Sequence, residues 1–272
     1  MKRQTTPPDP TSSLLAFFGS ELRRLRTKAG LSQRALAVKA HTTQSMLSKV
    51  EAAKQVPSVE LADDFDLALG TDGHFGRLHP LVLRYAYPSW FLPYVELEED
   101  ATSIHSYESQ IIHGLLQTEE YAQAMLEAVR PDNIEDLVTA RISRQCVFER
   151  EDGPYCWFIL DEYALCRHIG GVEVMRGQLE QLLRAGERPR TVIQVIPQNV
   201  PAHAGLSGPF AVLGFEENPD VLFVDGFSQG RLALETAEVE AGARAYDLLR
   251  AVALSPEASA ELIGAHLEGL RS

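Results

Sequence analysis

Residues 31–51 contain the feature that most constrains the fold: two short helical patterns separated by a tight turn. In the second pattern, Leu47 and Val50 have the spacing of buried positions. The positions of that pattern left facing solvent are polar: Gln44, Ser45, Ser48 and Lys49. The major groove of DNA accepts such a helix, because each base pair presents a distinct set of donors and acceptors there. The pattern therefore predicts a helix-turn-helix that reads DNA.

Charge is divided unevenly along the chain. The 272-residue sequence has a net charge of −13, which is unfavourable for binding to phosphates. However, residues 1–60 hold ten Lys or Arg against four Asp or Glu, a net +6, and the remainder holds fifteen against thirty-four, a net −19. An acidic surface also keeps a protein soluble, which explains the acidic part but not the basic end. The division indicates that only the N-terminal part contacts DNA.

The N-terminal part reads as a bundle of short helices. Apolar residues from Leu14 to Leu25 recur at helical spacing and predict a first helix. Ser32 and Thr42 are the predicted N-caps of the second and third helices. Ser58 opens a fourth helix, which Gly70 ends. An ordinary helical bundle would show the same apolar spacing, so periodicity alone leaves that alternative open.

Several short sequence motifs distinguish the N-terminal part from an ordinary helical bundle. They are Gly30-Leu31-Ser32-Gln33, Leu36-Ala37, Thr42-Thr43-Gln44-Ser45, Leu47-Ser48-Lys49-Val50-Glu51 and Pro57-Ser58. Together they resemble the Xre-type, or Cro/repressor-like, helix-turn-helix family of phage and bacterial regulators. The resemblance implies that Gln33 contacts a phosphate and braces the recognition helix. It also implies that Gln44, Ser45 and Lys49 face base edges, since Gln suits adenine and Lys suits guanine. The residues assigned to DNA contact are Gln33, Arg34, Thr43, Gln44, Ser45, Ser48, Lys49 and Lys54.

Two further features follow from this resemblance. Arg26 and Glu51 match a pair that is usually a structural salt bridge in the family, so we assign them to stability. The chain departs from the pattern at two positions, because His41 and Ala53 stand where the family usually or often has Gly. Both positions tend to need a left-handed backbone, which costs a residue with a Cβ atom about 1 kcal/mol.

Beyond residue 70 the sequence predicts a connector and then a mixed domain. Prolines and glycines interrupt the connector, whose aromatic residues are expected to pack on the following domain. Predicted strands lie at 155–160, 192–196, 210–215 and 221–224, and predicted helices at 118–129, 132–150, 172–185, 236–253 and 256–270. The predicted fold class is therefore an all-α helix-turn-helix bundle followed by an α+β domain with a small, mainly antiparallel sheet. The boundaries are 1–13 for a disordered tail, 14–70 for the helix-turn-helix DNA-binding domain, 71–95 for the connector and 96–272 for the α+β regulatory or interaction domain.

The C-terminal part carries a second set of strings. They are Tyr107-Glu108, the run from Gly114 to Ala122, Leu160-Asp161-Glu162, Gly170-Gly171, Gly208-Pro209-Phe210 and Ala253-Leu254-Ser255-Pro256. With the N-terminal strings, they resemble a large group of actinobacterial regulators in which an Xre-type module precedes a domain without an assigned function. Members are often encoded beside a very small protein, in pairs described as toxin–antitoxin-like. The resemblance implies transcription control, with sequestration of a small protein partner as an antitoxin-like alternative.

The sequence shows no recognised catalytic or metal-binding pattern. Candidate acid, base or ligand residues follow no known spacing; they are Glu108, His113, Asp161, Glu162, His168 and His203. Asp161 is instead expected to cap the helical segment after its strand. Cys146, Cys156 and Cys166 are spaced by ten, match no zinc pattern and are expected to be reduced and mostly buried, with a redox role left open. We expect no catalytic residue, no metal and no cofactor.

The expected partners follow from these features. They are a double-stranded DNA operator, a second copy of the chain, a small neighbour-encoded protein and a small-molecule effector. Helices 236–253 and 256–270 are the candidate dimerisation element, although their apolar positions suit the domain core equally. An effector pocket would be bounded by the segment Tyr85–Tyr94 and the loop Pro201–Pro209. Residues 191–215 carry no Asp, Glu, Lys or Arg, but Pro and Gly interrupt them, so we expect no membrane span and a cytoplasmic protein.

Overall fold

The chain divides into two structural units, and each unit is built from two separate segments. A computed structural model describes residues 9–227 and 229–270. The first unit combines the residues up to Ser89 with Arg130–Ser143, and the second combines Trp90–Val129 with the residues from Arg144 onward. Residues 1–8 of the predicted tail lie outside the described residues.

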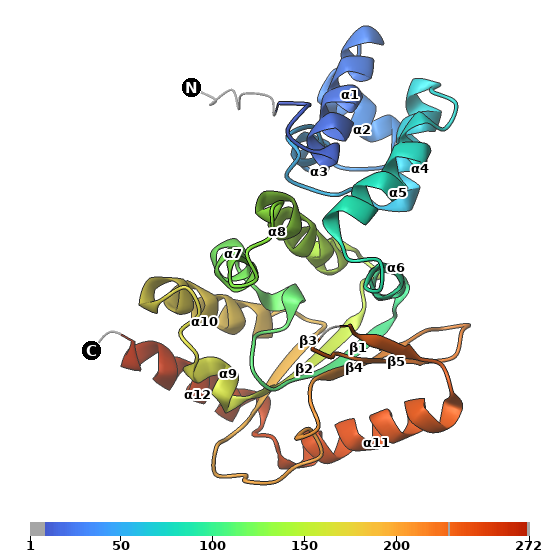
Figure 1. Ribbon diagram of the computed structural model, residues 1–272. Coiled ribbons are helices and arrows are strands. Elements are labelled where there is room, and N and C mark those ends of the chain that lie inside the picture. The colour runs from blue at the N-terminus through green and yellow to red at the C-terminus, as the bar shows by residue number, and fades with distance from the viewer. Residues whose placement is uncertain (1–8, 228, 271–272) are drawn as a thin grey trace. The chain divides into compact units, whose positions relative to one another are not determined.

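Among the described residues of the first unit, all regular secondary structure is helical (Figure 1). Its helices are α1 (Leu14–Lys28), α2 (Gln33–Lys39), α3 (Gln44–Glu51), α4 (Val59–Leu69), α5 (His74–Ala86) and α8 (Ile134–Ser143). Four of them begin at Ser or Thr residues whose side-chain oxygen accepts a backbone N–H three residues later, as N-caps do: Ser13, Ser32, Thr43 and Ser58. The prediction of Thr42 as the third cap is wrong by one residue. His41 turns the chain first, so that the Thr42 N–H bonds back to the Ala37 carbonyl at 2.9 Å.

Helix α5 lies in the segment that we predicted to be a connector, despite Pro80 in its interior. Its N-cap, Gly73, has no side chain to cap the helix. Asp66 of α4 takes over that role, because its carboxylate accepts the Phe75 N–H at 3.0 Å and the Gly76 N–H at 2.8 Å. The buried side chain of Phe75 then fixes α5 in the core of the unit.

Helix α8 comes from the middle of the chain and completes the first unit. The Ser143 hydroxyl accepts the Val56 N–H at 2.9 Å, and the Ser143 carbonyl accepts the Gln55 side-chain amide at 3.0 Å. Gln55 and Val56 follow α3 directly and are buried. The helix predicted over 132–150 therefore ends at Ser143, and its last part is a 3-10 helix, η2 (Arg144–Glu149), in the second unit.

The second unit is built on a mixed sheet. Within the described residues its strands are β1 (Ser103–Glu108), β2 (Tyr155–Asp161), β3 (Thr191–Ile196), β4 (Phe210–Gly214), β5 (Val221–Val224) and β6 (Arg231–Ala233), in the order β3-β2-β1-β4-β5-β6. Strand β2 pairs in parallel with both β1 and β3, and the other pairs are antiparallel. The prediction of a mainly antiparallel sheet is therefore wrong. Strands β1 and β6 are not among the predicted strands, and the parallel pairing of β1 with β2 makes one half of the sheet parallel.

Helices cover both faces of this sheet. They are α6 (Leu92–Asp100), η1 (Gly114–Leu116), α7 (Glu119–Glu127), α9 (Glu162–Cys166), α10 (Val172–Gly186), α11 (Thr236–Val252) and α12 (Pro256–Gly269). Side chains alternate along β2, so Phe158 packs with residues of α10 and α12, whereas Ile159 packs with α11. The buried residues Tyr246 of α11 and Ile263 of α12 thus belong to the core of this unit. None of the described helices is long and apolar enough to cross a membrane.

Candidate nucleic-acid interface

Helix α3 separates its polar and apolar side chains cleanly. Leu47 and Val50 are fully buried, as the sequence predicts. On the other side of the helix Gln44, Ser45 and Ser48 are exposed. Lys49 is half-buried near the end of the helix. The exposed face of α3 therefore presents amide and hydroxyl groups on a narrow helix, which are the groups that hydrogen-bond to base edges.

Glu51, the last residue of α3, joins three helices. Its buried carboxylate accepts hydrogen bonds from Arg26 of α1, at 3.0 Å from Nη2 to Oε2, and from Gln33 of α2, at 2.8 Å from Nε2 to Oε2. Arg26 also donates through Nη1 to the Leu31 carbonyl at 2.8 Å, just before α2. Because the carboxylate and guanidinium satisfy each other away from water, losing one partner would cost about 3–5 kcal/mol. This cluster fixes α3 relative to α2.

The two turns beside α3 are left-handed at the residues that lack the expected glycine. His41, between α2 and α3, has φ of 47°, and Ala53, after α3, has φ of 54°. Each costs about 1 kcal/mol relative to glycine. The compensating bonds are local: the Lys54 N–H, for example, bonds to the Lys49 carbonyl at 2.9 Å.

Basic side chains surround this helix pair. The exposed ones are Arg34 and Lys39 on α2 and Lys54 after α3. Glu51, the acidic residue between Leu31 and Lys54, is buried in its ion pair. Thr43 is exposed, although its hydroxyl serves as the cap of α3. The predicted DNA-contact residues thus lie on two adjacent helices and the turns beside them.

Two supports of this surface were not predicted from the sequence. The chain after α3 is held by Ser143 of α8, through the bonds to Gln55 and Val56. The bonded residues are 87 and 88 positions apart, so no local pattern around Ser143 indicates the contact. Gly19 of α1 was also unmarked. A Cβ atom there would lie 2.5 Å from the Val50 carbonyl oxygen, so only glycine lets α1 and α3 approach this closely.

The second unit contains a polar cavity of about 590 Å³ where the parallel strands β1, β2 and β3 end. Asp161, at the end of β2, accepts the Tyr163 N–H at 3.0 Å and thus caps α9, as predicted. Its other oxygen lies 3.5 Å from the Tyr107 hydroxyl and 3.3 Å from Nε2 of His203. The Gly205 N–H donates to Nδ1 of His203 at 3.2 Å, and Nε2 of the same ring faces the Asp161 carboxylate. Burial and then the Asp161 carboxylate raise the pKa of Tyr107, which keeps its hydroxyl protonated.

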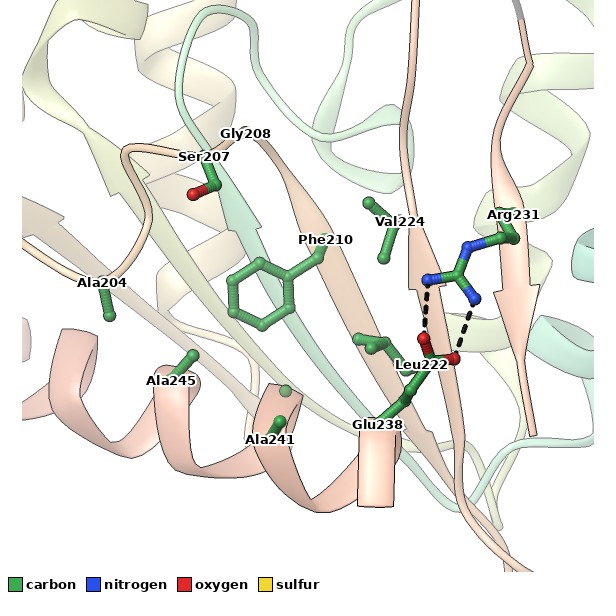
Figure 2. A pocket seen from close by; sticks show the side chains of 11 residues that line it. Ala204, Ser207, Gly208, Phe210, Leu222, Val224, Arg231, Glu238, Ala241 and Ala245 are labelled. Carbon is green, nitrogen blue, oxygen red and sulfur yellow. Dashed lines mark hydrogen bonds and ion pairs between the residues drawn. The ribbon is translucent and has the colours of Figure 1, made fainter. Parts of the chain in front are cut away.

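A smaller, mostly apolar cavity of about 300 Å³ lies between α11 and the strands β4 and β5. Figure 2 shows Phe210 and Leu222 facing the small side chain of Ala241, with the ion pair of Arg231 and Glu238 beside them. The predicted loop Pro201–Pro209 contributes residues to both cavities. Of the predicted aromatic segment, Phe91 and Tyr94 pack into the core against Phe223, at 5.9 and 4.3 Å between ring centroids, and line neither of these two cavities.

The remaining candidate residues do not join the polar cavity. His113 is buried, accepts the Leu115 N–H on Nδ1 at 3.2 Å and packs on Phe158. His168 is exposed. Glu162 instead lies with Cys166 and His266, where their ligand atoms are within 4.8 Å of one another and could hold a metal ion. All three cysteines are unpaired, and burial raises the pKa of the Cys146 and Cys156 thiols to about 12.

Each of the two units overlaps a region that a known protein-family model matches. A family model described as a helix-turn-helix domain matches residues 18–74, from within α1 to the first residue of α5. A second model, described as a domain of unknown function (DUF5753), matches residues 91–265. No curated protein and no solved structure matches the chain. The first match supports a DNA-binding role for the helical unit. The second covers more than half of the chain, which therefore belongs to the DUF5753 family.

Proposed function

We propose that this protein is a sequence-specific transcription regulator that places α3 in the major groove of DNA. The observation that carries the proposal is the exposed polar face of α3, held by the buried Glu51 cluster in a unit that matches a helix-turn-helix domain. A rigid, narrow helix with amide and hydroxyl tips suits direct readout of bases.

The proposed contacts divide into two classes. Gln44, Ser45 and Lys49 read base edges from α3. The residues that contact phosphates are Gln33, Arg34, Thr43, Ser48 and Lys54. Gln33 has two N–H groups on its side-chain nitrogen, so one serves Glu51 and the second serves a phosphate. The N-terminus of α2 also favours a phosphate through its backbone amides.

We further propose that the protein binds its operator as a homodimer. A single α3 contacts only a few base pairs, and two copies on a pseudo-palindrome supply the missing affinity. The half-sites are expected about 34 Å apart, one turn of DNA. Selection of binding sites from random DNA by the full chain, at a stated salt concentration, gives both the operator and this spacing. Recovery of single, unpaired half-sites would contradict the dimer.

The readout assignment is tested by replacing Gln44 and Lys49 together with Ala. Loss of each base contact is expected to weaken operator binding by about 5- to 150-fold, without a similar loss on random duplex. The measurement is a competition titration of operator against random DNA. The matched control replaces Gln123 of α7 and Lys28 of α1, both exposed and outside α2 and α3, with Ala. Unchanged discrimination by the α3 variant would exclude the proposed readout.

A second candidate function is control of DNA binding by a small molecule. The observation in its favour is the polar cavity, where Tyr107, Asp161 and His203 offer hydrogen bonds at the carboxyl ends of parallel strands. Ligands of open α/β sheets bind at this edge. The effector would be a small polar molecule with several hydrogen-bonding groups. A thermal-shift screen of polar metabolites, followed by operator titration with each hit, tests this function. A set of metabolites that stabilises the protein without changing operator affinity would contradict it.

A protein partner is the third candidate. The second unit holds eleven Lys or Arg against twenty-seven Asp or Glu, which would favour encounter with a small basic protein. Co-purification of the full chain with the protein encoded beside it tests this directly. Absence of a complex at low salt counts against sequestration.

A further inference from the structure

Three side chains with metal-binding chemistry meet between α9 and α12, away from the proposed DNA contacts. Glu162 and Cys166 are four residues apart on α9, so they lie on the same face of that helix. His266 comes from α12, which lies beside α9 in the fold (Figure 1). The carboxylate, thiol and imidazole ligand atoms all lie within 4.8 Å of one another.

The carboxylate of Glu162 is already oriented by its neighbours. One oxygen, Oε1, lies 2.9 Å from Nε2 of His266. The other oxygen accepts the backbone N–H of Gln198 at 2.8 Å. The side-chain amide of Gln198 also lies 3.2 Å from Sγ of Cys166. Hydrogen bonds of this kind orient the ligands of metal sites, because they hold a carboxylate in place while its other oxygen binds the ion.

The exposure of the three side chains suits capture of an ion from solution. The side chains of Glu162 and His266 are 14% and 24% exposed to solvent, and Cys166 is exposed. The hydrogen bond between Glu162 and His266 explains the contact of α9 with α12 without any metal. It does not explain why the thiol of Cys166 also lies within 4.8 Å of the Glu162 carboxylate and the His266 imidazole.

We propose that Glu162, Cys166 and His266 form a binding site for a divalent cation with affinity for sulfur, such as Zn²⁺. Zinc takes these three ligand types at about 2.0–2.3 Å in a tetrahedral arrangement, which places the ligand atoms about 3.3–3.6 Å apart. The observed 2.9 Å between Glu162 and His266 would open slightly, and Sγ of Cys166 would move inward. The fourth ligand is water on the exposed side.

Binding of the cation releases one proton from the protein. The Cys166 thiol releases its proton to solvent as the sulfur–metal bond forms, and the Glu162 carboxylate binds as the anion. Nε2 of His266 exchanges its hydrogen bond with Glu162 for the metal, and the neutral ring then carries its proton on Nδ1.

The cation would be connected to the polar cavity. Gln198 contacts both Glu162 and Cys166 and also lines the cavity, and Glu162 directly follows Asp161 in the chain. A cation at this position would therefore fix one wall of the cavity. The metal site does not depend on the proposed function, since its test is metal binding rather than DNA binding.

The experiment uses the full chain, stripped of metal by a chelator and titrated with Co²⁺ as the spectroscopic probe and then with Zn²⁺ in competition. One equivalent of Co²⁺ is expected to give the strong visible bands of a tetrahedral ion and a near-ultraviolet thiolate-to-cobalt band. The variant Cys166→Ser should lose the thiolate band. Its substitution is at an exposed position, so it tests the site without disturbing the core.

The variants His266→Ala and Cys166→Ser are each expected to weaken Co²⁺ binding by more than about 100-fold, beyond the loss caused by an outer-shell change. The matched control is His168→Gln, which removes an exposed histidine two residues from Cys166 and outside the cluster. This control should bind Co²⁺ like the natural chain. Three results would overturn the proposal: a weak octahedral spectrum, affinity unchanged in both variants, or equal loss in the control.

Discussion

The two units assemble their functional groups in opposite ways. In the helical unit, the proposed DNA contacts all lie between Gln33 and Lys54, on two helices and the turns beside them. In the sheet unit, Tyr107, Asp161 and His203 come from three separate parts of the chain. A short continuous stretch can therefore show a DNA-reading surface, whereas the polar cavity becomes visible only when the strands are placed side by side.

Each of the two units nevertheless contains a buried salt bridge between a glutamate and an arginine. In the helical unit, Glu51 pairs with Arg26. In the sheet unit, Glu98 of α6 accepts two hydrogen bonds from Arg144, both at 2.7 Å. The second pair is the more deeply buried, with 1% and 7% of the side-chain exposure against 4% and 12%. The comparison predicts a larger effect in the sheet unit.

The largest effect is expected from Glu98→Gln. Arg144 would keep its charge but lose the buried carboxylate that accepts two of its hydrogen bonds, which costs about 3–5 kcal/mol. Burial raises the pKa of the Glu98 carboxyl, but the charge and hydrogen bonds of Arg144, with the contributions of His113 and Tyr94, together lower the pKa overall. The natural pair therefore stabilises the protein above the unfolded glutamate pKa and loses that contribution as pH falls through the lower, folded pKa. Urea unfolding over a pH series should show this acid dependence in the natural chain and a flatter profile in the variant.

The control for this variant is Glu96→Gln, an exposed residue of the same helix. It should change stability by less than about 0.5 kcal/mol. Similar losses from the two substitutions would show that burial of the pair is not the cause.

A somewhat smaller effect is expected from Glu51→Ala in the helical unit. It removes the acceptor shared by Arg26 and Gln33 and is expected to cost about 3 kcal/mol, the lower end for a buried pair. Hydrogen exchange followed peptide by peptide should rise in α1, α2 and α3, and operator binding should fall. The matched control is Glu60→Ala, at an exposed position of α4. Faster exchange confined to the sheet unit would contradict the assignment.

Replacement of a helical glycine by alanine is expected to have opposite effects on stability in the two units. Gly19→Ala places a Cβ atom against the Val50 carbonyl and is expected to destabilise the helical unit by about 1–3 kcal/mol, although alanine favours helix. Thermal unfolding measures the loss, and reduced operator binding would accompany it. An unchanged melting temperature would mean that α1 and α3 can move apart without cost.

The same substitution in the sheet unit should have the opposite sign. Gly177 lies inside α10, and a Cβ atom there meets nothing within 4 Å. Gly177→Ala is therefore expected to stabilise the protein by about 0.5–1 kcal/mol, through the better helix propensity of alanine. The melting temperatures of Gly177→Ala and Gly19→Ala, measured side by side, test this difference. Destabilisation by both variants would show that α10 needs glycine for a reason outside its local packing.

The smallest effect is expected from Arg231→Ala, which removes an exposed ion pair with Glu238. Solvent screens this pair, so the melting temperature should stay within experimental error. Arg231 also lines the apolar cavity, and its loss should widen that opening. A clear drop in melting temperature would indicate that the pair supports β6 and α11.

Local chemistry explains what could be predicted from the sequence. The helical spacing that puts Leu47 and Val50 on one face and the caps at Ser32 and Ser58 depend on residues a few positions apart. These are the interactions that periodicity and capping rules describe. The left-handed turn at His41 was expected from the resemblance to the Xre-type family.

Long-range pairing explains what could not be predicted. Strand β1 reads Ser-Ile-His-Ser-Tyr-Glu and has few β-branched residues, yet it lies between β2 and β4. Its parallel pairing depends on β2, about 50 residues away, and not on its own composition. Pro80 argued against a helix whose start is capped by the carboxylate of Asp66, a residue of the preceding helix and outside any local capping pattern. The site shows the same division, because no spacing rule connects Asp161 with His203 or Glu162 with His266.

The return of α8 to the helical unit has a consequence for modularity. Many DNA-binding modules are moved between proteins as one uninterrupted stretch of chain. Here the segment after α3 is hydrogen-bonded to Ser143, which lies inside the region that matches the DUF5753 family. A gene fusion joined after residue 89 would leave this segment without its partner. A graft that keeps these two hydrogen bonds would have to carry residues 130–143 as a second piece, so the helical unit cannot be transferred as one continuous stretch of chain.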